Sequence, residues 1–159
     1  LVGSSNGVNI TDGLDGLATG VVAIIMTFFT VNAVKTGNTP MIIFGSTVVG
    51  TCLGFLIFNI KPAKVFMGDV GSLALGGAVA SIAIIMKMPL YLIIVALIPI
   101  IETLSSALQI IYFKITKGKR LFKMAPIHHH LELCGYGEKK IVAMFWGITL
   151  FLSVIAYFI

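Results

Sequence analysis

The sequence predicts an all-α fold, a polytopic membrane helical bundle, and two observations carry this prediction. Hydrophobic residues make up 58% of the 159 residues and charged residues only 11%, where a soluble domain has roughly 25% charged residues. The charges lie in short segments between long apolar runs, whose lengths are close to the roughly 20 residues that cross a bilayer. Five runs are predicted as transmembrane helices, at 17–34, 40–58, 72–86, 89–113 and 141–159.

The first two predicted spans follow a polar, glycine-rich segment, 1–16, and neither contains a charged residue. A short turn with Lys35 joins them, and Pro40 suits the first position of the second helix. Gly50 and Gly54 are spaced as in small-residue faces that pack membrane helices together. These features favour two adjacent spans.

The starts and lengths of the last three predicted spans are indicated by a serine, by prolines and by the lengths of the apolar runs. Ser72 is predicted to cap the third helix, and Pro89 opens the fourth. The fourth run would be roughly 36 Å long at 1.5 Å per residue, which exceeds a hydrocarbon core of roughly 30 Å, and Pro99 is predicted to kink it. The last run has 19 residues without charge.

Lysine and arginine predict the orientation. The two long loops, 59–71 and 114–140, carry nine of these residues, and the opposite turns carry two, Lys35 and Lys87. The positive-inside rule therefore places the long loops and 1–16 in the cytoplasm and the C-terminus outside. The same rule explains the net charge of +5, so nucleic acid is not expected as a partner.

The chain start, the cysteines and a glycosylation sequon indicate how the protein is processed. The chain starts within a motif, without an initiator Met or a signal peptide, so we expect it to be part of a longer chain. Cys52 and Cys134 are expected to be free thiols. A glycosylation sequon at Asn9 lies on the predicted cytoplasmic side and is therefore interpreted as a false positive.

The segment 66–72 is the first candidate site. Asp69 lies between Gly68 and Gly71, which let a ligand approach the backbone closely. A helix N-terminus favours phosphate, and a carboxylate beside it could hold Mg²⁺. The alternative is an ordinary helix start with a solvated aspartate.

A second candidate, 9–18, has two carboxylates, Asp12 and Asp15, three residues apart with interleaved glycines. In the first turn of a helix they would share a face and complement the helix dipole. That structural role would explain one of them, and ligand contact is the other interpretation.

Other polar residues flank these segments. Asn59 could recognise an amide or a base edge. Phe66 could stack on a planar ring or lie at the membrane interface. Lys61 and Lys64 could meet phosphate, although the membrane topology already explains their charge.

The most unusual segment, 124–133, contains the adjacent His128, His129 and His130. Adjacent side chains point in different directions, so a shared zinc ion is disfavoured and hydrogen bonding or proton exchange with phosphate is favoured. Glu102 and Gln109 share a face of the fourth span. An intramembrane acid is a functional candidate, and a buried structural acid is the alternative.

Together, the segments Asn9-Ile-Thr-Asp-Gly-Leu-Asp-Gly-Leu-Ala, Phe66-Met-Gly-Asp-Val-Gly-Ser-Leu-Ala and Met124-Ala-Pro-Ile-His-His-His-Leu-Glu-Leu resemble three motifs of the polyprenyl-phosphate N-acetylhexosamine-1-phosphate transferases. The third motif narrows the resemblance to the phospho-N-acetylmuramoyl-pentapeptide transferases. That family has about ten spans, so residues 1–159 would form the C-terminal half of one membrane transferase domain. Its paired aspartates, with a nearby lysine, would lie upstream of this chain.

The resemblance implies roles for individual residues. Asp69 is implied as the Mg²⁺ ligand, with Asp69 and His128 catalytic. The uridine-side pocket is implied to contain Gly13, Leu14, Asp15, Asn59 and Phe66, with Phe66 stacking on uracil. Further substrate or structural contacts are implied for Asn9, Asp12, Gln109, Ala125, His128, His129 and His130.

The implied reaction is magnesium-dependent transfer of phospho-MurNAc-pentapeptide from UDP-MurNAc-pentapeptide to undecaprenyl phosphate, giving lipid I and UMP. The implied location is the bacterial cytoplasmic membrane, with the site facing the cytoplasm in contact with membrane lipid, and a homodimer is left open. We favour direct attack by the lipid phosphate over an aspartyl intermediate. Two alternatives are a sibling transferase that uses UDP-GlcNAc and a transporter or channel segment that couples ions through Glu102.

Overall fold

The computed structural model describes residues 1–159 and consists of helices and connecting loops, without a strand. The helices are α1 (Val2–Thr11), α2 (Leu17–Lys35), α3 (Thr39–Asn59), α4 (Gly68–Ile85), α5 (Pro89–Val95), α6 (Leu97–Ile115), α7 (Ile127–Leu133) and α8 (Glu138–Phe158). Five of them, α2, α3, α4, α6 and α8, are long and apolar enough to cross a membrane. The prediction of an all-helical membrane bundle with five spans is confirmed.

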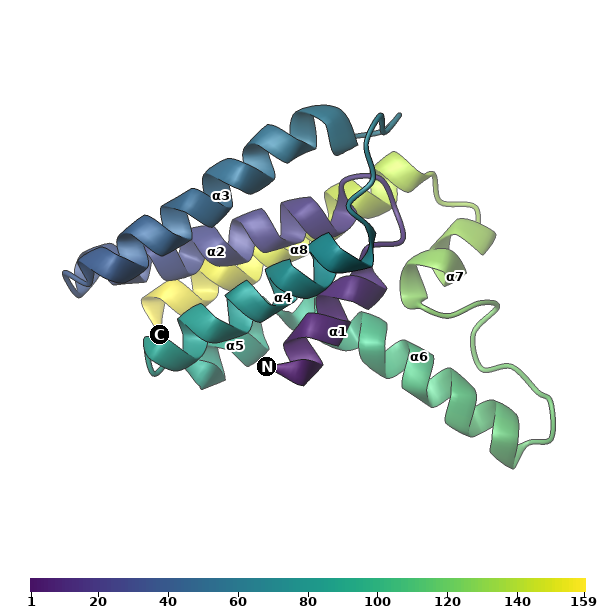
Figure 1. Cartoon of the computed structure of the whole chain (residues 1–159). Helices are drawn as coiled ribbons and strands as arrows, with labels where there is room; N and C mark the ends of the chain where they lie inside the picture. Colours follow the sequence, from purple (N-terminus) through teal and green to yellow (C-terminus); the bar gives the residue numbers. More distant parts are fainter.

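Helix α2 is the centre of the bundle and packs against α3 and α8 (Figure 1). It is apolar around its whole circumference, which is typical of a helix buried on all sides. Ile25, Met26 and Phe29 are completely buried. Helix α3 buries only Gly45, Cys52 and Asn59, so most of its apolar surface is exposed.

The polar segment 1–16 folds largely as helix α1, which packs against α4 and α6. The Ser4 hydroxyl donates to the Gly76 carbonyl at 2.9 Å, and the Ser5 hydroxyl donates to the Leu73 carbonyl at 2.7 Å. The small polar side chains therefore bind the backbone of α4, and small residues allow such close approach between helices.

The predicted start of the third span is wrong by four residues. Helix α4 begins at Gly68, and Ser72 is not its cap, because the Ser72 hydroxyl donates to the Gly68 carbonyl at 3.0 Å within the first turn. Asp69 is therefore the second residue of the helix. An acid in this position is stabilised by the free N–H groups and the dipole of the helix start.

The fourth predicted span is interrupted at Ala96, three residues before the proline that is predicted to kink it, Pro99, and therefore consists of two helices. Helix α5 ends at Val95, and Pro99 is the third residue of α6. Proline lacks an N–H group and its ring clashes with the carbonyl four residues earlier, so a continuous helix is disfavoured. Within the first turn of a new helix, the missing N–H group costs nothing.

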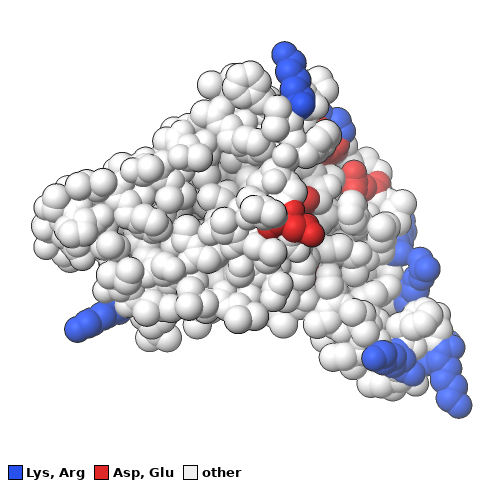
Figure 2. All heavy atoms as spheres, viewed as in Figure 1, with Lys and Arg blue, Asp and Glu red and all other residues white.

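Charged side chains gather toward the end of the bundle where α1 ends and α7 lies (Figures 1 and 2). The loops at this end are the two that carry most of the lysines. At the opposite end, Lys35 is the last residue of α2 and Lys87 lies in the turn after α4. The structure thus brings the charged loops together at one end.

We expect Gly76→Ala to reduce the thermal stability of the full-length protein. A Cβ atom at Gly76 would lie 2.6 Å from the Cα atom of Ser5 on α1, and overpacking typically costs about 1–3 kcal/mol. The matched control is Gly77→Ala, since a Cβ atom there meets nothing within 4 Å. Equal melting temperatures for the two variants would contradict the close packing of α1 on α4.

Candidate functional site

A polar cavity of about 280 Å³ lies between the loop that follows α1 and the start of α4. Its lining includes eight residues predicted from the sequence, namely Asn9, Asp12, Gly13, Leu14, Asp15, Asn59, Phe66 and Asp69, together with Met67 and Gly68. The first and second motifs, more than 40 residues apart in the sequence, therefore form one cavity.

Asp69 is exposed to this cavity and is held by α1. The Asn9 amide donates to Asp69 Oδ1 at 3.0 Å and to the Ser72 hydroxyl oxygen at 2.9 Å. Gly68, immediately before Asp69, has a φ of +65°, which glycine adopts without strain. Because Asn9 orients one carboxylate oxygen of Asp69, the second is left for a ligand.

Asp12 is a half-buried residue directly after α1, on the same cavity. Burial and, to a smaller extent, the negative charge of Asp69 raise the pKa of Asp12 from 3.8 to about 6. The two carboxylates thus repel each other across the cavity, and this chain places no lysine or arginine in its lining. Mg²⁺ is commonly held by one or two carboxylates plus substrate phosphates, so Asp12 and Asp69 fit this ion.

The prediction that Asp12 and Asp15 share a helix face is wrong, because both lie in the loop between α1 and α2. The Asp15 carboxylate accepts a hydrogen bond from the Ala63 N–H at 3.0 Å, and the Asp15 N–H donates to Glu138 Oε1 at 2.9 Å. Glu138 also pairs with Lys61. This network ties α8 and the loop after α3 to the start of α2.

Glu138 was not predicted as a site residue. Its partner Asp15 is 123 residues away in the sequence, and Ala63 takes part only through its backbone, which leaves no residue-type signal. Glu138 lies in the first turn of α8, where an acid is already explained by the helix dipole. Its contact with the site is therefore visible only in the structure.

Asn59 supports the loop that carries Phe66. The Asn59 side chain is buried, accepts a hydrogen bond from the Thr19 hydroxyl at 2.9 Å, and donates to the Val65 carbonyl at 3.0 Å. Phe66 follows directly and is 74% exposed. A large aromatic ring is thus left free at the edge of the cavity.

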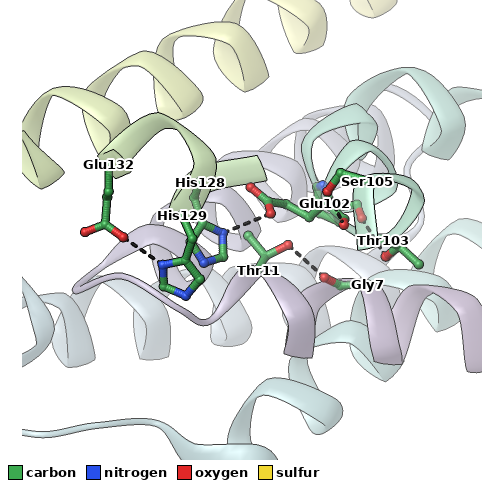
Figure 3. Close-up of polar contacts among 9 residues, drawn as sticks. Gly7, Thr11, Glu102, Thr103, Ser105, His128, His129 and Glu132 are labelled. Carbon is green, nitrogen blue, oxygen red and sulfur yellow. Dashed lines mark hydrogen bonds and ion pairs between the residues drawn. The ribbon is translucent and has the colours of Figure 1, made fainter. Parts of the chain in front are cut away.

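The three histidines have three different partners, which agrees with the expectation from their adjacency. His128 Nδ1 lies 2.9 Å from Glu102 Oε2, and His129 Nδ1 lies 2.7 Å from Glu132 Oε2 (Figure 3). His130 Nδ1 accepts a hydrogen bond from the Lys123 N–H at 3.1 Å. None of the three lines the cavity.

His128 nevertheless contacts Gly13, which lines the cavity. It is 1% exposed, and its imidazole packs so closely on Gly13 that a Cβ atom there would overlap the ring. The third motif therefore supports the loop of the first motif. Glu102, for which the sequence offered no partner, is paired with this histidine.

Gln109 and Ala125 also lie outside the cavity lining. Gln109 Oε1 accepts hydrogen bonds from the N–H groups of Leu121 and Phe122 at 3.1 and 2.9 Å, and its Nε2 donates to the Phe122 carbonyl at 3.1 Å. Gln109 thus holds the loop between α6 and α7. A substrate contact by Gln109 or Ala125 stays a prediction.

We expect Glu138→Ala to lower the melting temperature of the full-length protein. The change removes the acceptor of the Asp15 N–H and the partner of Lys61, and a hydrogen bond to a charged group typically contributes about 1.5–3 kcal/mol. Glu138→Gln should have a smaller effect, since an amide oxygen can still accept. The neighbouring Lys139→Ala serves as the control, and an equal loss in it would contradict the role of Glu138.

Comparison with known proteins adds independent information. The chain is 57% identical, over 99% of its length, to a protein of Acetivibrio thermocellus named phospho-N-acetylmuramoyl-pentapeptide-transferase. Proteins of the same name from Clostridium botulinum (strain Eklund 17B) and Bacillus cytotoxicus are 54% and 52% identical, over 97% and 100% of the chain. The matches cover 48%, 47% and 49% of these relatives. The chain thus spans about half the length of the curated relatives that it matches.

A family model supports the same relationship. The model described as "Glycosyl transferase family 4" matches residues 1–87, a region that contains the first two motifs and every residue lining the cavity. This region is more than half of the 159 residues. The chain therefore belongs to glycosyl transferase family 4.

Proposed function

We propose that the full-length protein transfers phospho-MurNAc-pentapeptide from UDP-MurNAc-pentapeptide to undecaprenyl phosphate, giving lipid I and UMP. The cavity that joins Asp12 and Asp69 carries this proposal, because two acids beside an exposed aromatic ring suit a metal-bound sugar nucleotide. The relatives named phospho-N-acetylmuramoyl-pentapeptide-transferase support the choice of substrate.

Asp69 would hold Mg²⁺ together with Asp12. Asn9 fixes Asp69 Oδ1 by a hydrogen bond of 3.0 Å, which orients the carboxylate before a ligand arrives. When bound, the ion would neutralise the charge that develops on the UMP leaving group. Its presence would also relieve the repulsion between the two carboxylates.

The nucleotide end of the donor would lie against Phe66. The exposed ring can stack on uracil, and Gly13, Leu14 and Asp15 line the same cavity. The side chains of Asp15 and Asn59 already bind Ala63, Thr19 and Val65. These two residues would therefore shape the pocket, and Phe66 would contact the base.

The reaction needs no strong general base, because the acceptor phosphate has a second pKa near 6 and is mostly dianionic at pH 7. We propose direct attack of a lipid phosphate oxygen on the sugar-linked phosphorus, with cleavage of its bond to the UMP oxygen. Trapping a phosphorylated aspartate in the full-length enzyme would overturn the one-step route. A direct catalytic contact by His128 stays a prediction, since the ring is buried against Gly13.

The site would face the cytoplasm of the bacterial inner membrane. The two loops that form the charged end carry nine of the eleven lysines and arginines, which supports this orientation. A donor from the cytoplasm and a lipid acceptor could meet at such a membrane edge. We further propose that residues 1–159 are the C-terminal half of one transferase domain, whose upstream half supplies further carboxylates. A homodimer stays a prediction.

A substrate-preference assay tests the proposal. The purified full-length protein, incubated with undecaprenyl phosphate and Mg²⁺, should release UMP from UDP-MurNAc-pentapeptide and form the lipid-linked product. UDP-GlcNAc should be a poor donor under the same conditions. Preference for UDP-GlcNAc would instead identify the sibling transferase, and no transfer from either donor would refute the function.

A further inference from the structure

Glu102 and His128 form a pair that is completely enclosed by protein. Their side chains are 0% and 1% exposed, and Glu102 Oε2 lies 2.9 Å from His128 Nδ1. The remaining polar atoms, Glu102 Oε1 and His128 Nε2, are also buried and have no hydrogen-bond partner. Burying such groups is costly, so stability alone is a poor explanation for the pair.

The pair joins three separate parts of the chain (Figure 3). Glu102 lies on α6 and His128 on α7, and the Nε2 edge of the imidazole abuts Gly13. Gly13 stands between Asp12 and Asp15, whose carboxylates are the polar groups of the loop between α1 and α2. The imidazole therefore packs against this loop without lining the cavity.

We propose that Glu102 is a positioning residue that acts through His128 on the loop 12–16. The Glu102 carboxylate accepts the Nδ1–H of His128 and fixes the plane of the ring. The Nε2 edge, without a proton, then packs on the Gly13 backbone and holds Asp12 and Asp15 in place. This inference rests on the proposed function in one respect, namely that the loop 12–16 belongs to the site that binds the sugar-nucleotide donor.

A simple structural pair would behave differently from a positioning pair. If the pair only stabilised the fold, its loss would reduce the melting temperature and the amount of active enzyme, and the KM for each substrate would stay constant. If it positions the loop, its loss raises the KM for the donor nucleotide. The KM for the lipid acceptor then changes little, because the loop belongs to the nucleotide side.

Glu102→Ala in the full-length enzyme tests this difference. Alanine cannot accept the Nδ1–H of His128, and we expect the donor KM to rise about tenfold, the lower end of the losses found when the carboxylate partner of a metal-bound histidine is removed. Glu102→Gln should raise the donor KM less, because its amide oxygen can still accept this N–H group. The control is Thr103→Val, since the Thr103 hydroxyl binds the carbonyl of Pro99 on its own helix at 2.8 Å. Unchanged donor KM in Glu102→Ala would overturn the inference.

A measurement on the wild-type protein does not depend on turnover. The imidazole ¹⁵N chemical shifts of His128, assigned by comparison with His128→Asn, should show a protonated Nδ1 and an unprotonated Nε2. An unprotonated Nδ1 would overturn the proposed arrangement. Absence of transferase activity in the wild type would refute the proposed function instead, and the nitrogen shifts would still decide the positioning of the ring.

Discussion

Asp69→Asn should reduce UMP release by the full-length enzyme about a hundredfold to a thousandfold, the loss typical when a group that stabilises transition-state charge is removed. The variant keeps the size of the side chain and an oxygen that Asn9 can still bind. It removes the negative charge that we propose as the anchor of Mg²⁺. The Mg²⁺ dependence of the residual rate should weaken together with the rate.

The control for this variant places the same side chain one position along the helix. Val70→Asn also introduces an asparagine into the first turn of α4, at a residue that is 87% exposed and does not line the cavity. We expect it to retain most of the activity. Normal turnover in Asp69→Asn, or an equal loss in both variants, would remove Asp69 from the metal site.

The helical fold could be predicted from the sequence because a bilayer imposes a simple length and polarity rule. Runs of 18 and 19 uncharged residues leave little alternative to spanning helices. This rule does not predict short polar helices that are stabilised by packing against a neighbouring helix. Helix α1 is an example, because its polar serines are bonded to the α4 backbone, and only the packing explains why the segment is helical.

The cavity could be predicted in composition but not in geometry. Residue types and motif order identified Asp12, Asp15, Phe66 and Asp69. The spacing of Asp12 and Asp15 was interpreted as helical, but a helix end at Thr11 places them in a loop with different partners. Contacts such as Asp15 with Glu138 depend on tertiary packing over 123 residues.

The pairing of Glu102 with His128 could have been inferred in part. An acid inside an apolar helix needs a partner, and the chain has only three histidines. The choice among them depends on the start of α7 at Ile127, which points His128 into the bundle and leaves His129 and His130 half-buried. That helix start follows a loop whose path is set by Gln109, and sequence patterns do not predict such a path.

Asp12→Asn should affect stability and activity in opposite directions. Burial and the charge of Asp69 raise the pKa of Asp12 to about 6, so above pH 6 the folded protein contains a carboxylate that would be more stable without its charge. A shift from 3.8 to about 6 corresponds to roughly 3 kcal/mol at 1.36 kcal/mol per unit. Because Asp12 is partly exposed, solvent screening reduces this to about 1 kcal/mol. In metal-free buffer at pH 7.5, the variant should melt about 2–4 °C higher than the wild type, yet transfer more slowly, because a metal ligand is lost.

The pH dependence of stability follows from the difference between the pKa of Asp12 in the folded and the unfolded protein. Because the folded protein binds the Asp12 proton more tightly, the wild type gains stability as the pH falls through about 6. The gain is complete below the unfolded pKa of 3.8. The advantage of Asp12→Asn should therefore shrink between pH 7.5 and pH 5. Asp15→Asn is the matched comparison, and it should lower the melting temperature slightly, because an amide oxygen accepts the Ala63 N–H less strongly than the Asp15 carboxylate does. A lower melting temperature for Asp12→Asn at pH 7.5 would show that the Asp12 charge is stabilised by a partner, and Asp12 would then not be poised to receive a cation.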